Sequence, residues 1–162
     1  MAHTQYDMAI IGGGSGGLTA ARIATSLGAN VLLLDKERLG GDCLNYGCVP
    51  SKSLIHVARV VQQAKDAAKL GLEPVNLGVD MAKVSQYIHG VIERVAEGEK
   101  VYSEGATVQF GKVVFCSPTE LSLNGEAVTC RSTLIATGSH PFVPEIEGLE
   151  ETGYSTNEGV FD

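Results

Sequence analysis

The 162-residue chain is long enough for one domain with a hydrophobic core, and its 44% hydrophobic and 19% charged residues are ordinary for a globular protein. A formal net charge of −7 argues against nucleic acid or an acidic membrane surface as the main partner. No apolar run reaches the roughly 18 residues of a membrane span. No basic, cleavable leader precedes the first strand-like segment, so we expect a cytoplasmic protein.

The first segment has the pattern of a βαβ unit. Tyr6–Ile11 is an apolar run that ends in glycines, which predicts a buried strand. Leu18–Leu27 carries apolar residues at helical spacing, and Gly28 follows it as a typical helix terminator. Val31–Leu34 predicts a second buried strand.

Two longer helices are predicted in the middle of the chain. The first lies within residues 43–70 and accommodates Pro50 in its first turn, where no intrahelical donor is required. Its apolar face consists of Leu54, Val57, Ala58, Val61, Ala64 and Ala68. The second runs from about Met81 to Tyr102. Its inward residues are Val84, Ile88, Val91, Ile92 and Val95.

From Thr107 onward the apolar residues alternate with period two, as in strands. The predicted strands are Val108–Phe110, Val113–Cys116, Glu120–Leu123, Ala127–Cys130 and Thr133–Ala136. Asn124-Gly125 is a strong hairpin signal, and little periodicity is left after Pro141. We expect an α/β, Rossmann-like dinucleotide-binding domain with a central parallel sheet, helices and a three-stranded antiparallel β-meander.

Gly12-x-Gly14-x-x-Gly17 lies between the first strand and the first helix. The three glycines permit a tight turn, close approach to a pyrophosphate, and close strand–helix packing, while the helix start offers free N–H groups. Asp35 ends the second strand, where its carboxylate can accept both ribose hydroxyls. The motif does not separate FAD from NAD. A glycine-rich turn without ligand, and a surface acid at position 35, are the alternatives.

Cys43 and Cys48 are the only close pair among the four cysteines. No second close pair accompanies them, which disfavours zinc, and we predict no metal site. In a chain without a leader, a close pair is more often catalytic or metal-binding than structural, the structural alternative being two inert buried thiols.

The spacing of these cysteines indicates a strained bridge. In an ideal helix, residues i and i+5 have Cα atoms about 8.6 Å apart, whereas a disulfide needs them within roughly 7 Å. A disulfide would therefore require Cys43 to leave ideal helix geometry, at a distorted first turn. A constrained bridge is readily reduced, and a helix N-terminus stabilises a thiolate, so the pair suits redox catalysis.

The segment Leu39-Gly-Gly-Asp-Cys-Leu-Asn-Tyr-Gly-Cys-Val-Pro-Ser-Lys52 resembles the redox signature of the class I pyridine nucleotide–disulfide oxidoreductases. That family includes dihydrolipoamide dehydrogenase, mercuric reductase and glutathione reductase. The resemblance extends over the whole chain, from the glycine loop to Ala136-Thr-Gly-Ser139. It implies that residues 1–162 are an N-terminal FAD-binding domain.

The resemblance also implies roles for the matching residues. Cys43 would be the interchange thiol that meets the substrate, and Cys48 the thiolate beside the flavin. Lys52 would lie near the reactive edge of the flavin and stabilise negative charge there, or else be a solvated helix lysine. Val113 would contact adenine through its backbone. The other cofactor-binding residues would be Gly12, Gly14, Ser15, Gly17, Asp35, Lys36, Gly41, Asp42, Thr137 and Gly138.

Three residues depart from the usual family pattern. Asp35 replaces a glutamate, which shortens the reach to the ribose. Asp42 replaces a threonine and brings a carboxylate near a pyrophosphate, which is unfavourable unless the side chain turns away or is paired. Tyr46 replaces a smaller residue between the cysteines. Val49 is more typical of mercuric and glutathione reductases but does not decide the substrate.

A second glycine motif for NAD(P)H and a C-terminal interface domain with a His–Glu pair are not found in this sequence. We therefore expect a fragment, inactive by itself, of a homodimeric reductase. The parent would pass electrons from NAD(P)H through FAD to the Cys43–Cys48 disulfide and on to a small-molecule disulfide or Hg(II). The alternatives are a stand-alone nucleotide-binding module with a cysteine redox switch, and a Rossmann domain that binds NAD.

Overall fold

The computed structural model describes residues 5–73 and 75–161, which divide into two compact units. We call residues 5–43 and 96–140 the sheet unit. Residues 44–73, 75–95 and 141–161 form the helical unit. No helix in these described residues is both long and apolar enough to cross a membrane.

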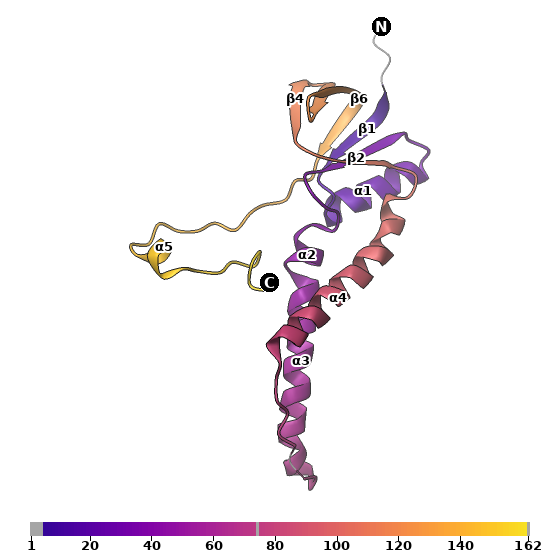
Figure 1. Cartoon of the computed structure of the whole chain (residues 1–162). Coiled ribbons are helices and arrows are strands. Elements are labelled where there is room, and N and C mark those ends of the chain that lie inside the picture. Colours follow the sequence, from indigo (N-terminus) through magenta and orange to yellow (C-terminus); the bar gives the residue numbers. More distant parts are fainter. Residues whose placement is uncertain (1–4, 74, 162) are drawn as a thin grey trace. The chain divides into compact units, whose positions relative to one another are not determined.

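The sheet unit is built on one six-stranded sheet in the order β3-β2-β1-β6-β5-β4. Figure 1 labels β1, β2, β4 and β6 of this sheet. The strands are β1 (Tyr6–Ile11), β2 (Val31–Asp35), β3 (Thr107–Phe110), β4 (Val113–Ser117), β5 (Glu120–Leu123) and β6 (Glu126–Ile135). β3, β2, β1 and the second half of β6 run parallel, whereas β4, β5 and the first half of β6 are antiparallel. The predicted α/β fold with a meander is confirmed.

The prediction of two separate strands at Ala127–Cys130 and Thr133–Ala136 is wrong, because β6 is continuous. Its first residues pair with β5 and the rest pair with β1. Arg131 and Ser132 interrupt the apolar pattern, but they do not turn the chain. Ser132 stays in register opposite Met8.

The hairpin predicted at Asn124-Gly125 is confirmed. Asn124 has φ 51° and Gly125 has φ 96°, the left-handed pair that a two-residue hairpin turn requires.

Both faces of the parallel strands are covered. Helix α1 (Ser15–Ser26) packs on one face. The core there consists of Ile10, Leu18, Ala21, Val31 and Leu33. The meander covers the other face, where the core consists of Ala9, Leu32, Leu34, Leu121, Leu123, Val128 and Cys130. A strand covered on both faces is apolar at every position, which is why Val31–Leu34 shows no alternation.

The helical unit contains the two predicted long helices, both of which are confirmed. They are α3 (Cys48–Asp66) and α4 (Met81–Glu99), whose last residues, from Ala96, belong to the sheet unit. Each continues into a 3₁₀ turn, η1 (Ala67–Leu70) and η2 (Lys100–Ser103), which the apolar pattern does not distinguish from α-helix. Short α2 (Gly41–Asn45) begins in the sheet unit and ends in the helical unit.

The predicted apolar face of α3 lines a groove of about 290 Å³. Its apolar lining is Leu54, Val57, Ala58 and Val61 from α3, with Val79, Met81 and Val84 from the start of α4 and the residues before it. Of the predicted inward residues of α4, Val84 and Ile88 are buried, and Val91, Ile92 and Val95 are partly buried.

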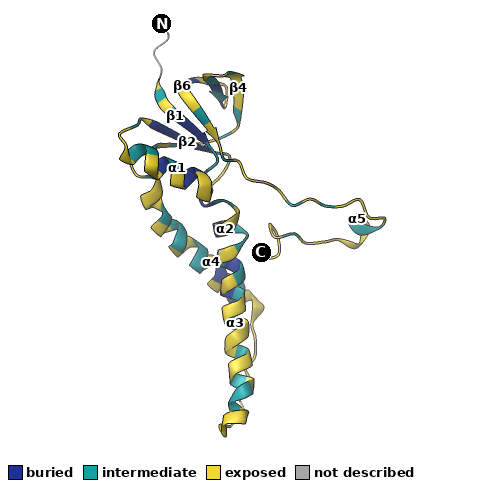
Figure 2. Ribbon diagram, turned by 180° about the vertical axis from the view of Figure 1, so that it is seen from behind, coloured by how far each residue is buried: buried dark blue, intermediate teal, exposed yellow. Residues whose placement is uncertain are grey.

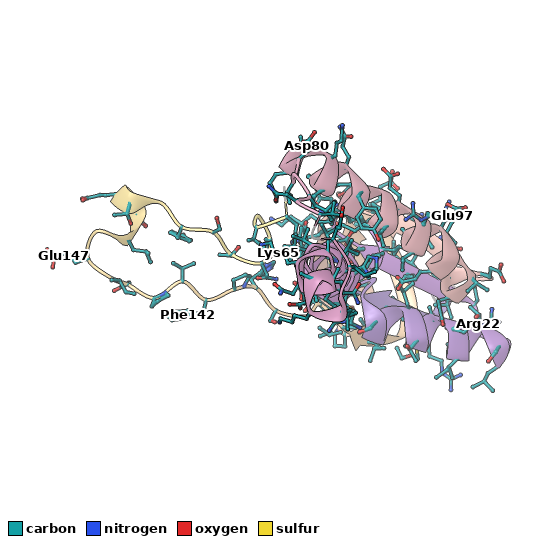
Figure 3. All side chains as sticks on the ribbon, turned by 90° about the horizontal axis from the view of Figure 1, so that it is seen from below. Arg22, Lys65, Asp80, Glu97, Phe142 and Glu147 are labelled. Carbon is teal, nitrogen blue, oxygen red and sulfur yellow. The ribbon has the colours of Figure 1, made fainter. Side chains whose placement is uncertain are left out.

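Residues 141–161 contain one short helix that the aperiodic sequence did not predict, α5 (Leu149–Thr152). Left-handed Gly148 (φ 80°) precedes it. Phe142, labelled in Figure 3, is 87% exposed on the extended chain before α5.

Candidate functional site

The glycine loop between β1 and α1 has no room for side chains at two of the motif glycines. A methyl group at Gly12, whose φ is 110°, would overlap the carbonyl oxygen of Ala136. A methyl group at Gly17 would overlap the carbonyl oxygen of Gly12. The turn and the close strand–helix packing expected of these glycines are therefore physical requirements of this loop.

The start of α1 is open to an anion. Gly14 is the N-cap residue, and α1 has neither a side-chain cap nor an acidic residue in its first turn. The first N–H groups of a helix have no intrahelical partner, so the amides from Ser15 onward can donate to a phosphate. Gly41 (φ 59°) comes close to this point, since a methyl group on it would lie 2.7 Å from the Cα of Gly14.

Asp35 ties the loop to the chain that follows β2. Its Oδ2 accepts the N–H of Gly13 at 2.7 Å. Its Oδ1 accepts the N–H groups of Glu37 at 3.1 Å and Arg38 at 3.3 Å. The N–H of Gly40 donates to the carbonyl of Gly13 at 2.8 Å, and that of Gly12 to the carbonyl of Leu34 at 2.7 Å.

Two other predicted segments meet the same loop. The end of β6 forms the wall at Gly12, and the N–H of Ala136 donates to the carbonyl of Ile11 at 2.8 Å. Thr137 and left-handed Gly138 follow directly and are exposed. On the other side, the N–H of Gly111 donates to the main-chain oxygen of Asp35 at 2.9 Å, two residues before Val113 begins β4.

The sheet unit thus gathers most of the predicted cofactor residues around the ends of β1, β2 and β6. They are Gly12, Gly14, Ser15, Gly17, Asp35, Gly41, Thr137 and Gly138, with Val113 at the start of β4. Lys36 is exposed directly after β2. Sequence reasoning gave no role to Gly13, Leu39 and Gly40, although the triple glycine and the glycine pair were visible signals.

Asn124 is a further residue whose side chain was missed. Its Oδ1 accepts the N–H of Lys112 at 3.0 Å, and its Nδ2 donates to the carbonyl of Phe110 at 3.2 Å. Its amide group fills the space beside Gly111 that a side chain there would need. The hairpin residue therefore also braces the turn between β3 and β4. The Asn-Gly turn accounts for the backbone conformation of Asn124, so no sequence pattern indicates a second role for its side chain.

The two predicted redox cysteines lie on different helices. Cys43 is the third residue of α2 and Cys48 the first of α3, and both are exposed. Between the helices the chain leaves helical geometry, with φ −121° and ψ −109° at Gly47. The departure from helical geometry therefore lies at Tyr46-Gly47, between the two cysteines, whereas the sequence pattern predicted it in a distorted first turn around Cys43.

The first turns of α3 are fixed by buried residues. Pro50 and Ser53 are buried, and the Ser53 hydroxyl donates to the carbonyl of Val49 at 2.8 Å. Lys52 is exposed four residues after Cys48, which puts both on one face of α3. Asp42 is exposed in the first turn of α2, next to Cys43.

The other cysteines lie in the meander. Cys116 is exposed on β4, whereas Cys130 is buried on β6 with its sulfur 3.2 Å from the Thr133 hydroxyl oxygen. Among the described residues, no group of three or more His, Cys, Asp or Glu side chains is arranged to hold a metal ion.

The glycine loop and the cysteine segment both lie within a region that matches a known protein family. Residues 6–160 match the family described as pyridine nucleotide-disulphide oxidoreductase. The chain belongs to this family. The resemblance found in the cysteine signature is therefore confirmed at the level of the family.

Relatives with different activities resemble the chain to a similar degree. It is 35% identical to a dihydrolipoyl dehydrogenase of Acholeplasma laidlawii, covering 91% of this chain and 45% of the relative. It is 31% identical to a mercuric reductase of Staphylococcus aureus, covering 97% and 29%. It is 34% identical to a glutathione reductase of Burkholderia cepacia, covering 97% and 35%. The chain thus spans less than half the length of these relatives.

Proposed function

We propose that residues 1–162 are the FAD-binding part of a flavoprotein disulfide reductase, with Cys43 and Cys48 as its redox couple. One observation carries the proposal. Gly41, whose backbone meets Gly14 of the glycine loop, lies only two residues before Cys43 on the same short helix. The glycine loop and the proposed interchange thiol are thus joined by a few residues of one element.

The residues around the loop fit the adenosine and pyrophosphate parts of FAD. Amides at the start of α1 would hold the pyrophosphate. Because Gly12, Gly14 and Gly41 have no side chains, the protein backbone could approach the pyrophosphate closely. Asp35 would contact the adenosine ribose, and Val113 and Thr137 would line the cofactor. When bound, FAD would supply two-electron transfer between NAD(P)H and the cysteine pair.

The cysteines would carry out thiol–disulfide exchange. In the dithiol form, the thiolate of Cys43 attacks one sulfur of a substrate disulfide, and one thiol leaves with a proton. Cys48 then attacks the Cys43 sulfur, releases the second thiol and restores the Cys43–Cys48 disulfide. Two electrons and two protons have moved to the substrate. Lys52, on the face of α3 that carries Cys48, would stabilise negative charge developing near that thiol.

This proposal does not choose among the possible substrates or between NADH and NADPH. The relatives include a dihydrolipoyl dehydrogenase, a mercuric reductase and a glutathione reductase at similar identity. We propose a small-molecule disulfide or Hg(II) as the substrate, NAD(P)H as the electron donor and a homodimer as the assembly of the parent enzyme.

Flavin binding tests the first half of the proposal. We expect the purified chain to bind added FAD in a one-to-one complex, followed by flavin absorbance after removal of free cofactor. NADH added together with FAD in a second sample should not reduce the amount of FAD bound. Binding of NAD without binding of FAD would replace the flavin assignment by that of an NAD-binding Rossmann domain.

Thiol titration tests the second half. Mild oxidation of the wild-type chain should remove two titratable thiols, and dithiothreitol should restore them. Cys48→Ser should abolish this paired loss. Cys116→Ser is the matched control, because Cys116 is also exposed but lies on β4, and it should leave the paired loss unchanged. Oxidation of Cys43 without Cys48 would contradict the redox couple.

A further inference from the structure

The glycine loop is already held in shape by the chain itself, and Gly13 is its fixed point. The N–H of Gly13 goes to Asp35 and its carbonyl accepts from Gly40. A methyl group at Gly13 would overlap the Cδ2 of Leu39. Gly13 is buried and is not one of the three motif glycines, yet both its N–H and its carbonyl are hydrogen-bonded within the chain.

The amide of Gly13 therefore cannot serve a phosphate. It donates to a carboxylate oxygen at 2.7 Å, a short charge-assisted bond that a phosphate would have to displace. The open amides lie further along, at the uncapped start of α1 from Ser15 onward. The loop thus divides its donors between the Gly13 amide, which maintains its shape, and the amides at the uncapped start of α1.

The number of hydrogen bonds that Asp35 accepts also indicates a role in holding the loop. A carboxylate has about four lone-pair positions. Three N–H groups, those of Gly13, Glu37 and Arg38, already donate to this one. About one position is left, so the carboxylate has little capacity for both hydroxyls of a ribose.

We propose that Asp35 is a positioning residue for the phosphate-binding loop, acting through the amide of Gly13, and that contact with the ribose is its lesser role. This inference rests on the proposed nucleotide site. The short aspartate is what permits it, because its carboxylate lies between the Gly13 amide on one side and the Glu37 and Arg38 amides on the other. One methylene more would move the carboxylate away from this position.

Two variants and one matched control separate the roles. Asp35→Asn is neutral and has a single acceptor oxygen, so the charge-assisted bond to the Gly13 amide is lost even where that oxygen takes its place. Asp35→Glu keeps the charge and the reach to a ribose but displaces the carboxylate from Gly13. Asp7→Asn is the control, because Asp7 Oδ2 accepts the backbone N–H of Asn30 at 2.8 Å in the same unit, at the opposite end of β1.

Calorimetric titration should use ADP and 2′,3′-dideoxy-ADP, which lacks both ribose hydroxyls. We expect Asp35→Asn to weaken both nucleotides by the same factor, about tenfold, as loss of a hydrogen bond to a charged group predicts. Asp35→Glu should also weaken both, and Asp7→Asn neither. A loss seen with ADP and not with the dideoxy nucleotide would overturn the inference and make Asp35 a ribose ligand only.

Hydrogen exchange supplies a reading that needs no nucleotide. In the free wild-type chain, the Gly13 amide hydrogen should exchange slowly, as measured by NMR. In both Asp35 variants it should exchange at least tenfold faster. The samples compared should have the same far-ultraviolet circular dichroism as the wild type. An unchanged rate in both variants would overturn the inference. If the wild type bound neither nucleotide while the Gly13 amide responded as expected, the proposed nucleotide function would fail and the positioning role would stand.

Discussion

The two units differ in how completely they bury their apolar residues. In the sheet unit, Val31, Leu32, Leu33 and Leu34 are all fully buried between α1 and the meander. In the helical unit, α3 and the residues up to α4 keep much of their apolar surface in water, as Figure 2 shows along α3. The exposed side chains there are Ile55, Val60, Leu70, Leu72, Val75, Leu77, Val79 and Met81.

The same contrast holds for the predicted functional groups. The glycine loop is restrained by hydrogen bonds from β2, β6 and the segment after β2, whereas Cys43 and Cys48 are exposed on either side of a helix break. The glycine loop is thus specified by local packing. Its sensitivity to substitution should exceed that of the helical unit, and paired variants in the two units test this difference.

The largest effect is expected from glycine replacements. Gly17→Ala puts a methyl group onto the Gly12 carbonyl and should prevent the sheet unit from folding, as followed by circular dichroism and nucleotide binding. Gly28→Ala has open space but a left-handed φ of 83°, and should cost about 1–2 kcal/mol. Gly90→Ala, on α4 of the helical unit, should stabilise by up to about 1 kcal/mol. Equal costs at all three sites would contradict the contrast.

Truncation of core side chains comes next. Leu33→Ala removes a fully buried side chain and should lower the free energy of unfolding by about 2–5 kcal/mol, measured by urea denaturation. Ile55→Ala, whose side chain is 48% exposed on α3, should cost less than about 1 kcal/mol. A larger loss at Ile55 than at Leu33 would mean that α3 carries more of the stability than its exposure indicates.

The brace at Asn124 should have a moderate effect. Asn124→Gly keeps the left-handed turn and loses the bonds to Lys112 and Phe110, which should cost about 1 kcal/mol in urea denaturation. Asn124→Ala adds the strain of a left-handed alanine, about 1 kcal/mol more. If the two variants were equally stable, the backbone conformation would not matter at this position.

The smallest effect concerns pH. Burial raises the pKa of Glu99, whose Oε2 is buried without a hydrogen-bond partner in the described chain. The folded value lies above the unfolded one of about 4.3, so stability falls as pH rises through this window. Glu99→Gln should therefore stabilise at pH 7, by well under 1 kcal/mol after solvent screening, and not at pH 3.5. A gain independent of pH would point to the amide contacts and not to the charge.

Sequence patterns predicted most of the fold because the elements are strongly periodic and their ends carry glycines. Tyr6–Ile11 and Glu120–Leu123 match the observed strands, and Gly28 ends the first helix with a left-handed φ. The continuity of β6 was missed because its pairing with β1 depends on residues about 120 positions away. The residue types at Arg131 and Ser132 give no indication that this part of the chain pairs with β1.

The sequence predicted which residues belong to the candidate site, from their types and spacing. It did not predict which of these residues contact one another. The three motif glycines and Asp35 were identified from their positions between strand and helix. The bond between Asp35 and Gly13 was not, because a side chain that caps a backbone amide 22 residues away leaves no periodic trace. The same holds for the side-chain bonds of Asn124.

The pairing of β1 with β6 has a consequence for synthesis. Tyr6 lies opposite Cys130 and Ile11 opposite Ile135, so β1 is completed by a strand that follows it by more than 100 residues in the chain. At about 5–20 residues per second, β1 waits on the order of ten seconds on the ribosome with one edge unpaired. The wall at Gly12, formed by Ala136, arrives later still. A nascent chain can therefore assemble the glycine loop only after nearly the whole sheet unit has emerged, and until then β1 is an open edge for aggregation or for a chaperone.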